Sequence, residues 1–170
     1  MSQLFFPGIE WRETYLSGLK ECLDEGLPVK VNYDEAAADF LTYVKKIEAK
    51  KLGIGLPEGY SPETELWLID NGEYIGTVKI RHKLNKKLMA TEGHMGYYIR
   101  PKRRKMGYGK KILKLAVLKA ERLGIRDILL ACDETNIGSR RVIEANGGVL
   151  EDVVSNGDGK PRRLRFWITK

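Results

Sequence analysis

The chain has 170 residues, 42% of them hydrophobic, so it is long and apolar enough to bury the core of one domain and is not a disordered chain. Its formal net charge of +7 is unevenly spread, because residues 1–75 hold 7 Lys and Arg against 14 Asp and Glu, whereas residues 76–170 hold 23 against 9. The basic half favours a polyanionic partner and the acidic half a cationic one.

The sequence gives no sign of membrane insertion or secretion. No apolar run approaches the length of a membrane span, and residues 1–7 lack the basic start and long apolar core of a secretory signal. Cys22 and Cys132 are far apart, and neither belongs to a cluster with metal-ligand spacing. We therefore expect a cytoplasmic protein with reduced thiols, no membrane partner and no metal.

The first half of the chain predicts two helices followed by a hairpin. Apolar residues at helical spacing stop at Gly26, and a second helical pattern begins after Asp34, a candidate N-cap, and ends at Gly53. Asn71-Gly72 between two strand-like runs is a strong hairpin turn. The predicted elements are helices over residues 10–25 and 34–52, a loop over 53–63, strands over 65–70 and 73–80, and a short strand over 4–6 with weaker support.

The second half alternates strands and helices. Glycines at 124 and 147–148 end the two helical patterns, and a polar loop over residues 156–161 separates the last two strands. The predicted elements are a strand over residues 94–99, a helix over 107–123, a strand over 127–132, a helix over 136–145, and strands over 149–154 and 164–169. This order indicates the α/β class with a mixed sheet.

The segment between the strand at 94–99 and the helix at 107–123 is the most informative stretch. A glycine-containing basic loop that opens a helix presents backbone N–H groups to an anion. A Walker loop is excluded, because Arg104 and Lys111 occupy positions that need Gly and Ser or Thr. A dinucleotide-binding loop needs a third glycine where the chain has Ile112. The pattern [R/Q]-x-x-G-x-[G/A] fits in full, as Arg104-Lys105-Met106-Gly107-Tyr108-Gly109.

This hexapeptide resembles the acetyl-CoA pyrophosphate loop of the GNAT superfamily of N-acetyltransferases. A second family pattern, N-x-x-[AS] followed by an apolar-Tyr-Glu run and Gly, matches at Asn136, Ser139, Glu144 and Gly147. The order of elements is also similar to the GNAT fold, a mostly antiparallel sheet that is splayed in the middle and has helices on both faces. The resemblance implies a single N-acetyltransferase domain over residues 1–170, with acetyl-CoA as co-substrate.

The resemblance also implies which residues bind the cofactor. Asn136 would bond the pantetheine arm or the loop beside it, although a plain N-cap explains the same residue. A backbone N–H near Tyr98 or Ile99 would polarise the thioester carbonyl. The full set of candidate cofactor-binding residues is Tyr98, Ile99, Arg104, Lys105, Met106, Gly107, Tyr108, Gly109, Lys110, Asn136 and Ser139.

The catalytic groups are less well defined. Glu92 and His94 open the strand before the loop and are candidate general bases, although ordinary strand-edge residues explain them as well. The tyrosine that commonly protonates the leaving thiolate in this family falls at Ile143, and isoleucine cannot donate a proton. Either the thiolate leaves unaided, or another donor acts, with the candidates being Tyr97, Tyr98, Tyr108 and Cys132.

The sequence leaves the acceptor open. The function expected is transfer of the acetyl group to a primary amine of a small molecule or a peptide by direct attack in a ternary complex. The acidic balance of residues 1–75 favours a cationic amine. The alternatives are a basic nucleic-acid-binding module, for which no accompanying motif is present, and a CoA-binding GNAT protein without transferase activity. A homodimer is an expectation at the level of the family, and no nucleic-acid partner is expected.

Overall fold

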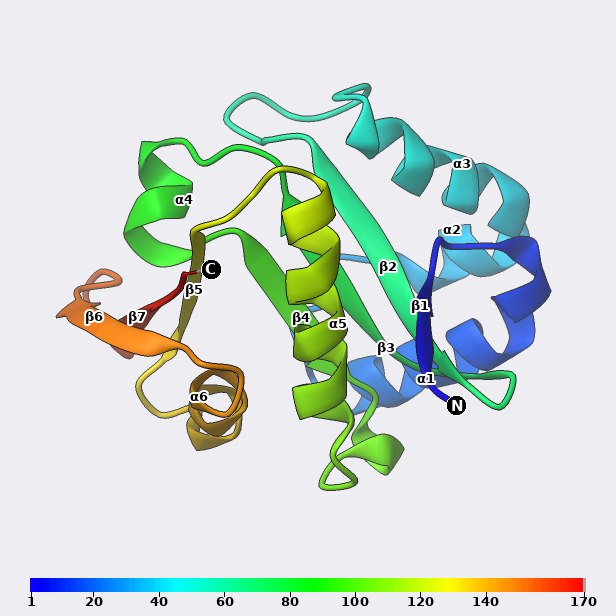
Figure 1. Ribbon diagram of the computed structural model, residues 1–170. Helices are drawn as coiled ribbons and strands as arrows, with labels where there is room; N and C mark the ends of the chain where they lie inside the picture. The colour runs from blue at the N-terminus through cyan, green and yellow to red at the C-terminus, as the bar shows by residue number, and fades with distance from the viewer. Residues whose placement is uncertain (170) are drawn as a thin grey trace.

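In residues 1–169, the part of the chain that the computed structural model describes, the strands form two antiparallel sheets that lie next to each other (Figure 1). The predicted domain boundary at Lys170 lies outside the described residues. The first sheet has the order β1-β2-β3-β4 and the second the order β5-β7-β6. The strands are β1 (Gln3–Phe5), β2 (Glu63–Asp70), β3 (Glu73–Arg81), β4 (Met95–Ile99), β5 (Ile128–Asp133), β6 (Val149–Val154) and β7 (Arg163–Ile168).

Helices cover both faces of the first sheet. The helix α5 packs on β3 and β4 over one face, while α1 and α3 pack on β3 and β2 over the other (Figure 1). The helices are α1 (Arg12–Asp24), α2 (Tyr33–Ala38), α3 (Phe40–Lys51), α4 (Lys86–Thr91), α5 (Tyr108–Arg122) and α6 (Ile137–Glu144), with 3-10 turns η1 (Ile9–Trp11) and η2 (Pro101–Arg103). None of the helices in residues 1–169 combines the length and the apolar composition needed to span a membrane.

The alternation of side chains along the strands produces two hydrophobic cores. Leu66, Val78 and Ile80 face α5 together with the apolar residues of β5 and β7. Trp67 and Tyr74 point to the opposite face, where Tyr15 of α1 stacks on Trp67 with ring centroids 4.1 Å apart. Both cores exclude water, and together they fix the central strands from either side.

In residues 1–169, the backbones of the two sheets are joined at one end of β4. The backbone N–H of His94 donates to the carbonyl of Leu129 at 2.7 Å, and Gly93 forms an isolated bridge with Leu130. Beyond this point β4 and β5 form no ladder, and the sheets diverge (Figure 1). The mixed α/β fold with a splayed, mostly antiparallel sheet is therefore confirmed.

One local prediction was wrong, and one short helix was not predicted. The segment predicted as one helix from Asp34 contains two, because Asn32 caps α2 by accepting from Glu35 N–H, and Asp39 caps α3 by accepting from Thr42 N–H. The short helix α4, for which no element is predicted from the sequence, is capped by Asn85 and anchored by Leu88, which is buried. In both places a side-chain oxygen starts a helix that hydrophobic spacing alone does not mark.

Candidate functional site

The loop before α5 holds a row of backbone N–H groups open to solvent. Lys105 and Gly107 both have positive φ angles, +60° and +85°, so the chain turns sharply before the helix begins. The first intrahelical bond of α5 runs from Lys111 N–H to Gly107 O. Within residues 1–169, the N–H groups of residues 105–110 have no acceptor. Such a turn at the start of a 15-residue helix is an anion-binding geometry.

The structure requires glycine at positions 107 and 109 of the loop for two different reasons. A Cβ on Gly107 would meet nothing within 4 Å, so this glycine is required by its left-handed backbone. A Cβ on Gly109 would lie 3.0 Å from Cγ2 of Val142, so this glycine lets α5 pack closely against α6. Gly109 therefore serves the packing of the two helices, in addition to any close approach of a ligand to the loop.

The arginines of the basic segment are paired within the protein. Arg104 donates from Nε to the carbonyl of Ile99 at 3.1 Å, and its Nη1 lies 2.7 Å from a carboxylate oxygen of Glu25. Arg103 forms a two-pronged pair with Glu73. By contrast, Lys105 and Lys110 have no ion pair among the described residues. This pairing removes much of the charge that a nucleic-acid interface would use.

The free edge of β4 carries backbone groups that face the gap between the sheets. The ladder with β3 closes through Arg100, whose N–H donates to Ile75 O, and through His94, whose carbonyl accepts from Arg81. Along a β-strand, the backbone N–H and C=O groups of successive residues point alternately to the two sides. Those of His94 and Arg100 point to β3, so those of Tyr97 and Ile99 point away from it. Of the two residues expected near the thioester carbonyl, Ile99 has its N–H on the open edge, whereas Tyr98 pairs with β3. The backbone N–H of Tyr97 also lies on this open edge. Tyr97 is not among the cofactor-binding residues predicted from the sequence, because only the strand register reveals the direction of its N–H.

Across this gap, α6 contributes Asn136 and Ser139. Asn136 caps α6 through its Oδ1, which accepts from Ser139 N–H at 3.0 Å, and its amide Nδ2 has no partner among the described residues. The hydroxyl of Ser139 lies 3.0 Å from that of Tyr97 on β4. Burial raises the pKa of Tyr97 to about 12 and also raises that of the neighbouring Cys132 thiol. Both groups therefore stay protonated near neutral pH.

The other two tyrosines point elsewhere. Tyr98 lies on the opposite face of β4 beside Tyr74 and Thr77, and burial raises its pKa. Tyr108 donates its hydroxyl to Asp70 at 2.7 Å, and this hydrogen bond raises the pKa of Tyr108. Tyr97 is thus the one of the three phenols that lies at the gap. Ile143, at the family's usual tyrosine position, is buried in the core below α6.

The two candidate bases lie at the far end of β4 from the loop, and each has a structural partner. A carboxylate oxygen of Glu92 lies 2.8 Å from Nη2 of Arg81. Nδ1 of His94 accepts from the backbone N–H of Leu129 at 3.0 Å, so the neutral ring carries its proton on Nε2. Burial, together with the nearby charge of Arg81, lowers the pKa of His94. His94 can therefore accept a proton on Nδ1 only if its hydrogen bond with the backbone N–H of Leu129 breaks.

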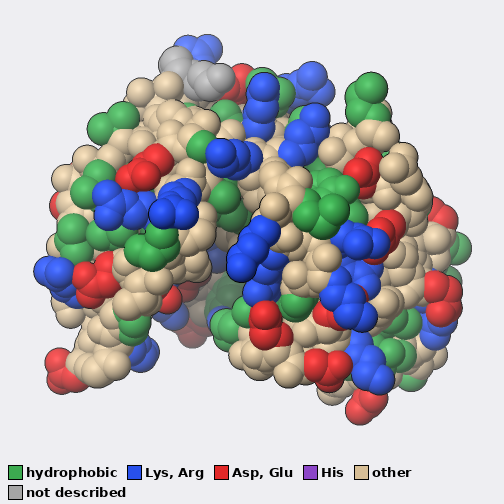
Figure 2. Space-filling model, turned by 90° about the horizontal axis from the view of Figure 1, so that it is seen from below, with side chains coloured by type: hydrophobic (Ala, Val, Ile, Leu, Met, Phe, Trp, Pro, Cys, Tyr) green, Lys and Arg blue, Asp and Glu red, His purple; other side chains and the backbone are tan. Residues whose placement is uncertain are grey.

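Viewed from below, the molecule shows a notch between the part built on the first sheet and the part that contains α6, β6 and β7 (Figure 2). Lys and Arg side chains gather on the surface beside this notch. An anion-binding turn after β4, together with the notch between the two parts of the molecule, suits a long ligand with an anionic head.

The match to a family model covers most of the chain. Residues 28–149 match the model described as the acetyltransferase (GNAT) domain. Among curated proteins, none matches the sequence significantly.

Solved structures resemble the fold over nearly the whole chain. The acetyltransferase MccE, a microcin self-immunity protein with acetyl-CoA and AMP bound, is 11% identical with a TM-score of 0.74, covering 99% of this chain and 92% of its own. RimJ of Mycobacterium smegmatis, with CoA-disulfide bound, is 14% identical with a TM-score of 0.74, covering 99% and 81%. A Salmonella typhimurium enzyme that modifies the N-terminal serine of a 50S ribosomal subunit protein is 15% identical with a TM-score of 0.67, covering 99% and 95%.

Proposed function

Since the chain belongs to the GNAT family of acetyltransferases, we propose that it transfers the acetyl group of acetyl-CoA directly to a primary amine in a ternary complex. The observation that carries this proposal is the row of unpaired N–H groups at residues 105–110, which opens next to the gap between β4 and β5. The diphosphate of CoA is a dianion of the size that such a row can hold. Lys105 and Lys110 would add positive charge without disrupting an internal ion pair.

The rest of the cofactor would follow the gap. The pantetheine arm carries amide groups, and the free Nδ2 of Asn136 faces the same region as the hydroxyl of Ser139. The backbone N–H of Ile99, on the open edge of β4, would donate to the oxygen of the thioester as negative charge develops there. Met106 and Tyr108 would then flank the diphosphate from the loop.

The reaction has two proton steps. The amine nitrogen attacks the carbonyl carbon of the thioester, the C–S bond breaks, and the amine loses one proton while CoA leaves as a thiolate that ends as the thiol. With a pKa near ~8.5, the thiolate is a tolerable leaving group without an acid. We propose unassisted departure, consistent with Ile143, and Glu92 as the better of the two candidate bases because His94 has its Nδ1 lone pair engaged.

The acceptor is proposed to be a cationic amine, but the acidic balance of residues 1–75 supports this less than the sequence suggests. Glu21, Glu25, Asp70 and Glu73 bind groups of the segment from Arg100 to Tyr108. Their charge is therefore used inside the protein. Glu92, at the other end of β4, is also paired, with Arg81, so its carboxylate would attract an amine only in competition with that guanidinium.

The test is a screen of acceptors with acetyl-CoA, read by release of the CoA thiol. The panel holds polyamines, aminoglycosides, amino acids, basic peptides and peptides that begin with serine. We expect release with at least one cationic amine, and kcat/KM for it should fall as salt rises at saturating CoA, because exposed charges are screened. A neutral best acceptor, or indifference to salt, contradicts the cationic proposal. CoA binding without release from any amine contradicts transferase activity.

A further inference from the structure

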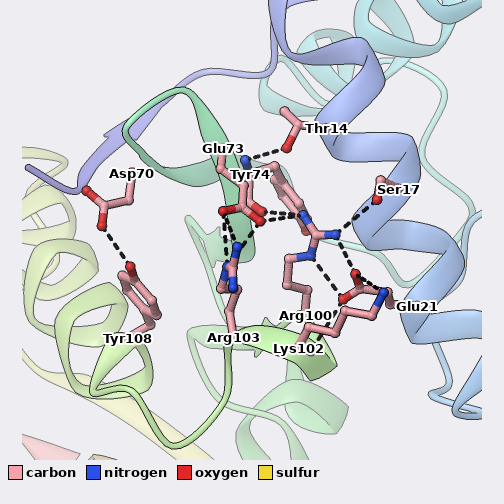
Figure 3. A network of polar contacts seen from close by, with 10 residues as sticks. All are labelled: Thr14, Ser17, Glu21, Asp70, Glu73, Tyr74, Arg100, Lys102, Arg103 and Tyr108. Carbon is pink, nitrogen blue, oxygen red and sulfur yellow. Dashed lines mark hydrogen bonds and ion pairs between the residues drawn. The ribbon is translucent and has the colours of Figure 1, made fainter.

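The segment that precedes the loop is held from one side by α1. Arg100 is only 5% exposed, and its guanidinium donates to both carboxylate oxygens of Glu21, at 3.0 and 2.5 Å, and to the hydroxyl of Ser17 (Figure 3). The backbone N–H of Lys102 donates to the same carboxylate at 3.3 Å. Ser17 and Glu21 are four residues apart and so lie on one face of α1. The hydrogen bond from Arg100 lowers the pKa of Glu21, so this carboxylate is charged near neutral pH.

The same segment is held from the other side by the turn between β2 and β3. Glu73 accepts from Nη1 of Arg100 at 3.1 Å and from Nη2 of Arg103 at 2.7 Å. Asp70, on the other side of that turn, accepts from the hydroxyl of Tyr108 at the start of α5 (Figure 3). Carboxylates on two separate elements therefore fix both ends of the loop, while its N–H groups at 105–110 stay free.

From this geometry we propose that Glu21 and Glu73 are positioning residues for the diphosphate of CoA. They hold η2 so that the following backbone, with Lys105 and Gly107 at positive φ, presents its N–H groups in one direction before the ligand arrives. Preorganisation of this kind increases affinity, because no binding free energy is spent on ordering the loop. The inference rests on the proposed function, since it assigns these carboxylates to the cofactor of that reaction.

The proposal and simple electrostatics predict opposite changes in CoA affinity when one of these carboxylates is neutralised. A carboxylate near a polyanion opposes binding, so neutralising Glu21 or Glu73 would strengthen CoA binding if charge alone mattered. If the carboxylates position the loop, neutralising either one weakens CoA binding instead. The direction of the change therefore separates the two explanations.

The experiment compares Glu21→Gln and Glu73→Gln with Glu13→Gln by calorimetry. Glu13 lies on the same helix and is exposed, and it contacts Arg12 but not the loop, so it provides the same change of charge. Each protein is titrated with CoA and assayed with S-acetylpantetheine, a donor that lacks the diphosphate. We expect the Kd for CoA to rise about tenfold or more in both test variants, with the control unchanged. The kcat/KM for S-acetylpantetheine should stay within about twofold of the wild type, which general loss of structure would not allow.

Unchanged or tighter CoA binding in a folded Glu73→Gln variant overturns the positioning role but leaves the proposed function intact. An equal loss with S-acetylpantetheine also overturns it. Glu73 is the more exposed of the two carboxylates, so its variant serves if Glu21→Gln does not fold. A wild-type protein that does not bind CoA overturns both this inference and the proposed function.

Discussion

The two ends of β4 use their side chains and backbone in opposite ways. At the C-terminal end the charged side chains are tied down, with Arg100 and Arg103 bound to carboxylates, and the backbone N–H groups of residues 105–110 are left free. At the N-terminal end the backbone is bonded, with His94 joined to Leu129, and the chemically useful groups are the side chains of Glu92 and His94. Anion binding therefore rests on the main chain, while proton transfer would rest on side chains that already have partners.

The difference explains why one end is easier to read from sequence. A site made of backbone needs glycine at fixed positions, and Gly107 at φ +85° is such a requirement. A site made of side chains depends on which partner each group meets in three dimensions, as Glu92 meets Arg81.

The largest expected effect is on stability, at Ile143. Its side chain is buried in the core below α6, so Ile143→Ala should lower the free energy of unfolding by about 2–5 kcal/mol. If this position only packs, kcat measured well below the midpoint of thermal unfolding should change by no more than a few-fold. Denaturant titration and steady-state kinetics check the two parts, and a large fall in kcat in the folded protein would give Ile143 a role in the chemistry.

The next effect concerns the loop that follows the C-terminal end of β4, where the backbone N–H groups are free. Gly107→Val places a β-branched residue at φ +85° and should cost about 1–3 kcal/mol or force the loop to change shape. We expect CoA affinity to fall at least about tenfold.

The matched control for this change is Gly124→Val at the other end of α5. Gly124 has φ +83° and equally open space, so the local strain is the same but the loop is untouched. Calorimetry with CoA should show a loss for Gly107→Val alone. Equal affinities in the two variants would remove the loop from the binding site.

A smaller effect is expected at Tyr97, whose hydroxyl meets Ser139 across the gap. If the thiolate leaves unaided, Tyr97→Phe should lower kcat by less than about tenfold, because only a neighbouring hydrogen bond is lost. Tyr98→Phe is the control, since its hydroxyl lies beside Tyr74 and Thr77 on the opposite face of β4. A fall of about 10²-fold in Tyr97→Phe, with CoA binding kept, is the size of acid catalysis and would assign that role to Tyr97.

The smallest effect concerns pH and the far end of β4. Burial lowers the pKa of His94 below the ~6.5 of an unfolded chain, so the unfolded state binds more protons as pH falls through that value. Stability should therefore be complete above ~6.5 and decline towards the folded pKa. His94→Asn keeps an acceptor near Leu129 N–H and should make the decline in melting temperature shallower. Burial also lowers the pKa of His82, so His82 should still cause part of the decline in stability in this variant. An unchanged pH profile would show that His94 does not carry this linkage.

Much of the fold could be read from the sequence because it depends on local chemistry. Asn71-Gly72 marks the hairpin between β2 and β3, and the hydrophobic spacing marks α5. What could not be read depends on pairing in space. The carboxylates of Glu21 and Glu73 are far along the chain from Arg100, and no spacing rule connects them. The N–H of Ile99 faces the gap because of the register between β3 and β4, which the sequence of β4 alone does not define.

The central claim is that the backbone of residues 105–110 binds the diphosphate of CoA. The most direct measurement is a titration of the isotope-labelled protein with CoA, followed by NMR of the backbone amides. The account predicts that the amide resonances of residues 105–110, Gly107 and Gly109 among them, shift with the largest changes and saturate together. S-acetylpantetheine should leave these amides nearly unmoved while it shifts the amide of Ile99. Saturable CoA binding that leaves residues 105–110 unshifted would contradict the account.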